Sequence, residues 1–510
     1  MLKRLLIAMC LCETLLCLTA FAQSLPESVS QKSYIQARQT LEAGIKAVGG
    51  LEALQGVTDI TREMTGARSD QGQGLQPVPV AQSGKPPVTN PYAKATSIRD
   101  LRSQRVMEYR EASSVFGGQP VRYRRIFSGA TMTSVNYITG VMQQNRPPNP
   151  ALVWASVARD YPESLLLRAW NNPQTLRWLG EAQSEGRAQQ VIAYADIDGA
   201  LVTLYFDAQT KLLTRRETLG DDPVLGVIAS ETVFSDWRSV GKLMLPYRYT
   251  DKVGGAVFID MQAHSIALNT QPPDGAFATP EGMTVHKPEP FSVKQLAPDV
   301  YVIRGGYNSL FVVFNDYVLV VEAGASPGYT QNCINEIKEV APNKPLRYLI
   351  TTHFHFDHVS GVRSYIAEGT TIVTTPTAKS VIERSASARL LRPDALARNP
   401  RQPVIETFKE KRVFDDGAHN VELYQFASPH ASEMIMIYLP KEKILFEADL
   451  LDLDLPENGV AAAGADTRDL LERIERWGLQ VEQLIPSHGR LGTMDDLRRA
   501  VAGGKAGNEK

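Results

Sequence analysis

One stretch constrains this chain more than any other: an apolar run beginning at Leu346 ends in three histidines and an aspartate, namely His353, His355, Asp357 and His358. Alternate side chains of an extended backbone point the same way, so His353, His355 and Asp357 can converge on one point. His358 follows where the chain turns. Imidazole nitrogens and carboxylate oxygens are the ligands that divalent metals such as zinc take. The chain has only 8 histidines in 510 residues, so chance clustering is rare, and the motif predicts a metal site or one that has lost its metal.

Three further candidate ligands, His430, Asp449 and His488, each stand directly after an apolar strand-like run. Sites in layered α/β folds collect at the carboxyl ends of strands, so these side chains and the first motif can meet at one edge. A lone histidine after a strand is usually an ordinary loop residue, but the order of all three after the first motif favours a shared site. The other histidines match no motif and are expected to be ordinary surface or core residues: His264, His286 and His419.

The length of the chain and the change in its secondary-structure pattern predict two domains. A chain of 510 residues is too long for one compact core. Short strands and turns dominate the first half, which predicts a mostly antiparallel, β-rich domain over residues 23–286. Within it, residues 66–91 are rich in Gly, Gln, Pro and Ser and are expected to form a long mobile loop. Strands and helices then alternate, which predicts an α/β layered domain over residues 287–510. Residues 384–403 interrupt this alternation and are expected to form a flap or insertion near the site.

The N-terminus has the pattern of a secretory signal over residues 1–22. Lys3 and Arg4 precede an apolar segment, and the small-x-small run at residues 20–22 fits a cleavage site before Gln23. We therefore expect an exported protein, periplasmic or secreted. The alternative is an uncleaved N-terminal anchor, for which the apolar run is short. No other segment is long and apolar enough to cross a bilayer, so no stable membrane span is expected after signal removal.

Charge and cysteine content argue against a nucleic-acid-binding protein and against a disulfide-stabilised one. The net charge of −2, from 54 basic and 56 acidic residues, gives no indication of a nucleic-acid partner. Three of the 4 cysteines lie in the predicted signal, so only Cys333 remains and no internal disulfide can form. Cys333 falls in a predicted amphipathic helix and is expected to be a small buried residue rather than a nucleophile.

The motifs ending at His358, His430, Asp449 and His488 together resemble the motif series of the metallo-β-lactamase superfamily. The resemblance covers about residues 291–501 and implies an αββα sandwich with a metal pair at one edge. It also implies three sets of ligands: His353, His355 and His430 for the first metal, Asp357, His358 and His488 for the second, and Asp449 as the bridge between them. The implied cofactors are two divalent ions, with Zn²⁺ favoured, although the same ligands accept iron or manganese.

This sequence departs from the usual pattern of the superfamily at three places. Glu322 stands where the superfamily usually has Asp, Glu447-Ala448 replaces a more usual Gly before the bridging residue, and Ser487 replaces a common Gly. None of these departures removes a ligand, but each can change the contacts that orient the ligands.

The resemblance implies a hydrolase acting on a small-molecule substrate. Two metals roughly 3.5–4 Å apart lower the pKa of a shared water, and the resulting metal-bound hydroxide attacks a scissile carbonyl. Asp357 is the catalytic candidate, because it can ligate, orient the attacking oxygen and pass its proton to the leaving group. Dedicated lactam-cleaving members commonly carry Cys or Ser where this chain has Asp449. We therefore favour an ester, thioester or lactone bond, with β-lactam cleavage as the alternative.

Two further hypotheses place the protein in functional classes other than hydrolases. One is a mononuclear iron oxidoreductase of the persulfide-dioxygenase type, which keeps the same motif but binds iron through two His and one Asp. The other concerns the first half, where residues 202–213 and 231–247 and the pair Gly49-Gly50 resemble the half-barrel domains of the lipoprotein-sorting family. That resemblance implies a groove for an apolar ligand, and hence a non-catalytic binding protein. The structural alternative is a sheet that only packs on the second domain.

Overall fold

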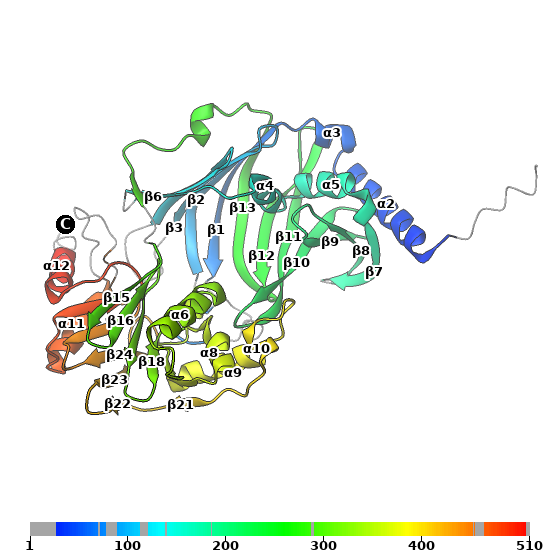
Figure 1. Ribbon diagram of the computed structural model, residues 1–510. Coiled ribbons are helices and arrows are strands. Elements are labelled where there is room, and N and C mark those ends of the chain that lie inside the picture. Colours follow the sequence, from blue (N-terminus) through cyan, green and yellow to red (C-terminus); the bar gives the residue numbers. More distant parts are fainter. Residues whose placement is uncertain are drawn as a thin grey trace, which may run out of the picture.

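The computed structural model describes residues 27–505 except 70–71, 78–88, 113–120, 138–139, 185, 287–289, 452 and 454–463. The predicted signal, residues 1–22, lies outside the described residues. One large sheet forms a first unit, and two smaller sheets with their helices form a second unit beneath it in Figure 1. No helix in the described part of the chain is both long and apolar enough to cross a membrane.

A sheet of 14 strands makes up the first unit. In spatial order its strands are β14 (Thr284–His286), β6 (Val141–Asn145), β5 (Thr131–Asn136), β4 (Val121–Ser128), β3 (Arg105–Ala112), β2 (Thr89–Asp100), β1 (Asp59–Ser69), β13 (Ala256–Leu268), β12 (Leu243–Val253), β11 (Gly226–Val240), β10 (Leu213–Asp222), β9 (Leu201–Asp207), β8 (Arg187–Ala195) and β7 (Arg177–Ser184). Neighbouring strands pair antiparallel except β14 and β6, which are parallel. The prediction of a large, mostly antiparallel N-terminal sheet is confirmed.

Helices cover part of one face of this sheet: α2 (Val29–Ala47), α3 (Leu51–Gln55), α4 (Pro150–Ala158) and α5 (Pro162–Asn171). Leu41 of α2 and Leu165 of α5 pack with Phe206 of β9 in one core cluster, and all three are fully buried. A cavity of about 60 Å³ beside this core has charged residues in its wall, among them Glu108 and Arg110. The half-barrel description and the apolar ligand stay predictions.

The predicted mobile loop at residues 66–91 is partly wrong, because strands enter it from both sides. β1 continues to Ser69 and β2 begins at Thr89. Gly66 pairs with Met261 on one side and with Tyr92 on the other. A Cβ at Gly66 would lie 2.2 Å from the carbonyl oxygen of Asp260, so the glycine that suggested a loop instead permits close strand contact.

The second unit contains a seven-stranded and a five-stranded sheet. The first has the order β15 (Ser292–Ala297), β16 (Val300–Arg304), β17 (Ser309–Val313), β18 (Val318–Val321), β19 (Leu346–Ile350), β20 (Thr371–Thr374) and β21 (Ile405–Thr407). The second has the order β22 (Lys411–Asp415), β23 (Asn420–Phe426), β24 (Met434–Leu439), β25 (Ile444–Glu447) and β26 (Gln483–Pro486). Leu319 and Ile350 of the first sheet share a buried core with Ile437 and Phe446 of the second, so the two sheets pack against each other.

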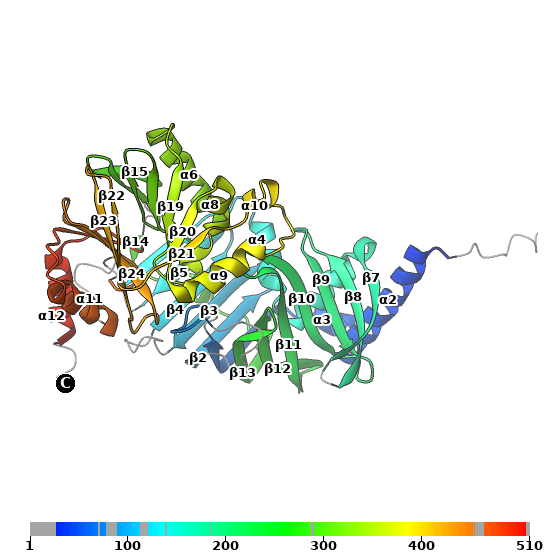
Figure 2. The same ribbon diagram turned by 90° about the horizontal axis from the view of Figure 1, so that it is seen from below.

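The helices of the second unit lie outside the two sheets: α6 (Pro327–Val340), α8 (Val362–Glu368), α9 (Pro376–Ser387), α11 (Ala465–Arg476) and α12 (Met494–Lys505). α8 contacts β19 and β20, and α9 contacts β21. Figure 2 shows α11 and α12 on the far side of β22–β24 from α8 and α9. Cys333 of α6 is buried, as predicted.

The hairpin between β10 and β11 joins the two units. Val224, at its turn, is fully buried in the core of the second unit. The amide of Val227 donates to the carbonyl of Arg389 at 2.8 Å. The segment predicted as a flap, residues 384–403, thus contacts the first unit through the end of α9 and the residues that lead to α10 (Ala395–Arg398). Arg363 of α8 holds this segment, because its Nε donates to Asp394 Oδ2 at 2.6 Å.

Candidate metal centre

The first motif enters the site from the middle of the seven-stranded sheet. β19 pairs parallel with β18 and with β20, and its carboxyl end leads directly into the histidines. β19 ends at Ile350, His353 lies in a bend, and His355, with φ −59° and ψ 146°, is the N-cap of the next helix. Asp357 and His358 follow in the short helix α7 (Phe356–Val359). His353 and His355 therefore reach the site from the loop that follows β19, whereas Asp357 reaches it from a helical turn.

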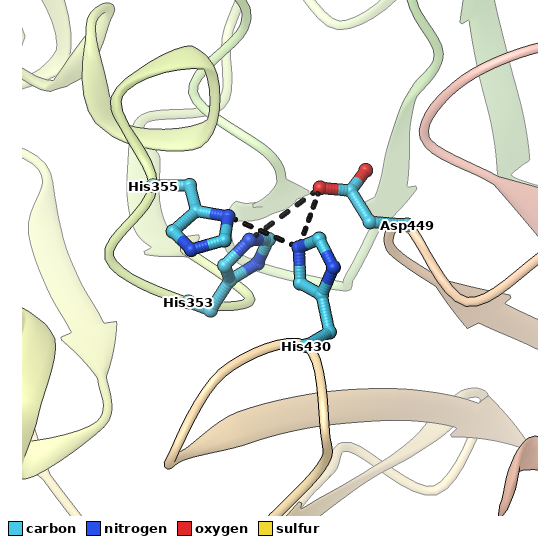
Figure 3. A group of neighbouring side chains, drawn as sticks. All are labelled: His353, His355, His430 and Asp449. Carbon is cyan, nitrogen blue, oxygen red and sulfur yellow. Dashed lines mark hydrogen bonds and ion pairs between the residues drawn. The ribbon is translucent and has the colours of Figure 1, made fainter. Parts of the chain in front are cut away.

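A first group of side chains consists of His353, His355, His430 and Asp449, whose ligand atoms all lie within 4.8 Å of one another. His430 Nε2 is 3.0 Å from His355 Nδ1. Asp449 Oδ2 lies 3.1 Å from His430 Nε2 and 3.5 Å from His353 Nε2. Figure 3 shows these side chains pointing toward one another, His353 and His355 from one loop and His430 and Asp449 from two other segments.

A second group consists of Asp357, His358, Asp449 and His488, within the same 4.8 Å limit. His358 Nε2 is 2.9 Å from Asp449 Oδ2, and His488 Nε2 is 3.1 Å from Asp357 Oδ2. Asp449 belongs to both groups. The structure thus brings every predicted ligand together in two overlapping clusters, while their role as ligands stays a prediction.

Burial and charge put His353 and His355 in the form that binds metals. Burial, followed by the neighbouring imidazoles, holds the pKa of His353 well below its ordinary value and lowers the pKa of His355 to about 4. Burial would raise the pKa of Asp449, but His358 and the other imidazoles around it hold that pKa well below its ordinary value. Neutral imidazole and ionised carboxylate are the ligand forms that metal binding requires.

His358 has the opposite electrostatic environment. Burial alone would lower its pKa, but the carboxylates of Asp449, Glu322 and Asp357 raise it well above the ordinary value. A buried imidazole among three carboxylates marks a site with surplus negative charge. A cation held by Asp449 and Asp357 would neutralise that surplus.

Residues outside the two groups contact the predicted ligands and orient them. Two of these residues, Glu322 and Ser487, are departures from the superfamily pattern. Glu322 is buried, and its Oε2 accepts from Tyr307 Oη at 2.6 Å and lies 3.0 Å from His358 Nδ1. Ser487 Oγ donates to Asp449 Oδ1 at 3.1 Å. Tyr307 was not predicted, because one tyrosine between two strands carries no sequence signal for this role.

The residues present fit a metal ion. His353 Nε2 is buried and has no hydrogen-bond partner among the described residues, whereas His353 Nδ1 lies 3.0 Å from Thr352 Oγ1. A buried polar atom without a partner is destabilising unless a ligand satisfies it. Asp449 also has φ 63°, a left-handed backbone conformation that is uncommon for non-glycine residues and most accessible to Asn and Asp.

Gly361 lets the motif approach the segment after β18, which carries Glu322 and Ala323. A Cβ there would lie 2.0 Å from the carbonyl oxygen of Ala323 and 2.0 Å from Thr330 Oγ1. We expect Gly361→Ala to lower the free energy of unfolding by about 1–3 kcal/mol through overpacking, measured by chemical denaturation. Gly328→Ala is the matched control, since a Cβ at that helical position meets nothing within 4 Å. Equal stability of the two variants would contradict the steric argument.

One family profile and several solved structures resemble part of this chain. The sequence profile of the metallo-beta-lactamase superfamily matches residues 302–488. Among solved structures, a metallo-beta-lactamase from Pontibacter korlensis is 20% identical, covering 42% of this chain and 97% of its own, with a TM-score of 0.33. The DIM-1 metallo-beta-lactamase is 17% identical, covering 44% of this chain and 100% of its own, with a TM-score of 0.32. TMB-1 is also 17% identical, covering 43% of this chain and 99% of its own, with a TM-score of 0.32. Residues 302–488 thus carry the sequence pattern of the metallo-β-lactamase superfamily.

Proposed function

We propose that this protein is an exported, dinuclear metal-dependent hydrolase in which an αββα sandwich holds two divalent ions, with zinc favoured, at one edge. The observation that carries the proposal is the place of Asp449, whose ligand atom lies within reach of both ligand groups. His353, His355 and His430 would hold one ion, with Asp449 between the two ions. Asp357, His358 and His488 would hold the other. Nitrogen and oxygen donors of this kind suit zinc, and also iron or manganese.

Metal ions in such a site supply Lewis acidity and lower the pKa of a coordinated water. The exposed fractions of the side chains indicate where the substrate enters. His488 is 40% exposed and Asp357 is 29% exposed, whereas His353 is fully buried. We infer that the substrate approaches over the second group. Asp357 then lies at the entrance, where it can orient the attacking oxygen and pass its proton to the leaving group.

The residue at position 449 bears on the substrate class. An aspartate there resembles the thioesterase and lactonase branches of the superfamily rather than the dedicated lactam-cleaving members. We therefore propose a small-molecule substrate with a carboxylic ester, thioester or lactone bond. The predicted ligands His353, His355 and His358 are buried. The bond to be cleaved must therefore lie at an exposed end of the substrate, which can enter the site.

The test is metal content per chain of the purified protein, followed by hydrolysis assays on esters, thioesters, lactones and β-lactams. We expect close to two zinc ions per chain, with hydrolysis lost on chelation and regained when zinc is returned. His264→Ala removes an exposed histidine of β13 and should leave both results unchanged. One iron per chain with oxygen uptake would indicate the oxygenase instead. A folded protein that takes up no metal would overturn the proposal.

A further inference from the structure

A segment of the first unit reaches the metal centre of the second. The connection between β1 and β2 includes residues 72–77, and Gly74 in it is buried. Gln73 Nε2 donates to Asp357 Oδ1 at 2.8 Å. The carbonyl oxygen of Gly74 lies 2.9 Å from His355 Nε2. The segment therefore contacts two predicted ligands, one from each group.

The contact with Gly74 determines which nitrogen of His355 is available to a metal. A carbonyl oxygen only accepts, so His355 Nε2 must carry the proton. Nδ1 is then left with its lone pair, and Nδ1 is the atom that lies 3.0 Å from His430 Nε2 inside the first group. Metal-ligating histidines commonly donate their second ring N–H to a carbonyl or carboxylate, which fixes tautomer and ring orientation.

The contact with Gln73 acts in the same way on Asp357. The amide N–H holds Oδ1, so Oδ2 faces the second group, 3.1 Å from His488 Nε2 and 3.4 Å from His358 Nε2. An amide donor leaves the carboxylate ionised and limits its rotation. It thereby selects which oxygen is offered to a metal.

The segment packs closely against the loop that carries His355 and Asp357. Gly72 has φ +71°, and a Cβ there would lie 2.5 Å from the ring of Phe356, so this position requires glycine. On the other side, the amide of Ser432, two residues beyond His430, donates to the carbonyl of Leu75 at 2.9 Å. The segment thus spans the loops that carry the ligands of the first group.

The large sheet also contacts the second unit at a second place, the hairpin between β10 and β11. Besides Val224, the turn of the β10–β11 hairpin offers the carbonyl of Pro223, which accepts from Ser385 Oγ at 2.7 Å. The amide of Leu391 donates to Asp221 Oδ1 at 2.5 Å. Two separate connections of one sheet therefore contact the second unit, the segment 72–77 and the β10–β11 hairpin.

We propose that Gln73 and Gly74 are positioning residues of the metal centre, so that the N-terminal sheet completes a site whose ligands all come from the second unit. This rests on the proposed function in so far as it requires a bound metal. It gives the sheet a role other than binding its own ligand, and it predicts that the metal site of this chain depends on both units.

The test measures Zn²⁺ affinity of the full chain by competition with a chromophoric chelator. Gln73→Met keeps the approximate side-chain length but removes the donor, and Gly72→Ala forces the segment away from Phe356. We expect roughly 10- to 100-fold weaker binding in each variant, the range typical for loss of contacts that orient ligands. Gln76→Ala changes an exposed glutamine of the same segment and should bind as the unchanged protein does.

Two further readouts separate positioning from folding. The thermal midpoint of the metal-free protein should be the same for Gln73→Met and Gln76→Ala. The ¹⁵N spectrum of labelled histidine should report the Nε2–H form of His355 in the unchanged protein and lose it in Gly72→Ala. Unchanged zinc affinity in both variants would overturn this inference alone, with the hydrolase proposal intact. Failure of the unchanged protein to bind any metal would overturn both.

Discussion

Replacement of Asp449 by alanine is expected to empty both ligand groups and to lower hydrolysis by about 10³-fold or more. The carboxylate lies within 4.8 Å of the ligand atoms of both groups, so its loss leaves each with imidazoles and at most one carboxylate. Metal ions contribute several kcal/mol of transition-state stabilisation, and each 1.36 kcal/mol is a factor of ten in rate. The measurements are metal per chain and kcat/KM on the substrate that the unchanged protein cleaves best.

The backbone at Asp449 requires a second variant. Alanine in the left-handed conformation at φ 63° adds strain, whereas asparagine tolerates it and keeps the shape of the side chain. Asp449→Asn should therefore fold as the unchanged protein does and still lose metal. Asp495→Ala, on the exposed side of α12, is the control carboxylate and should change neither metal content nor rate. Two metals retained in both Asp449 variants would refute the bridging assignment.

The candidate ligands could be predicted from the sequence because each follows a strand that ends at the same edge. His430 comes after β23, Asp449 after β25 and His488 after β26, and β25 pairs parallel with β26. Once those strands form two packed sheets, their ends must meet. Local residue order and one rule about strand ends were therefore enough to place ligands far apart in the sequence.

The contacts that orient these ligands could not be predicted, because they depend on segments without a pattern of their own. The composition around Gln73 and Gly74 indicates a mobile loop, yet their polar groups are used by Asp357 and His355. Such a contact depends on how two units pack, and neither periodicity nor spacing encodes that. The helical turn at Asp357 was missed for a related reason, since alternation in the sequence fits a strand until the chain turns.

The second large effect is expected at the centre of the N-terminal sheet, where Arg62→Ala should lower the free energy of unfolding by about 3–5 kcal/mol. Arg62 is fully buried and donates from Nη2 to Glu163 Oε1 at 2.7 Å and from Nε to Tyr249 Oη at 3.0 Å. Burial lowers the pKa of Arg62, but Glu163, Tyr249 and Tyr161 together raise that pKa above its ordinary value. Alanine leaves Glu163 buried without its cation. The large effect comes from this uncompensated buried charge.

Comparison with an exposed ion pair of the same sheet tests this reason. Arg248 donates to Asp260 at 2.7 Å, the same distance, but the two side chains are 52% and 34% exposed. Water already solvates these charges, so Arg248→Ala should change the stability by less than about 1 kcal/mol. The double variant Arg62→Met with Glu163→Leu should recover much of the loss, since no charge is then buried alone. Chemical denaturation gives all three values. Equal effects of Arg62→Ala and Arg248→Ala would show that burial of the pair is not what makes Arg62 important.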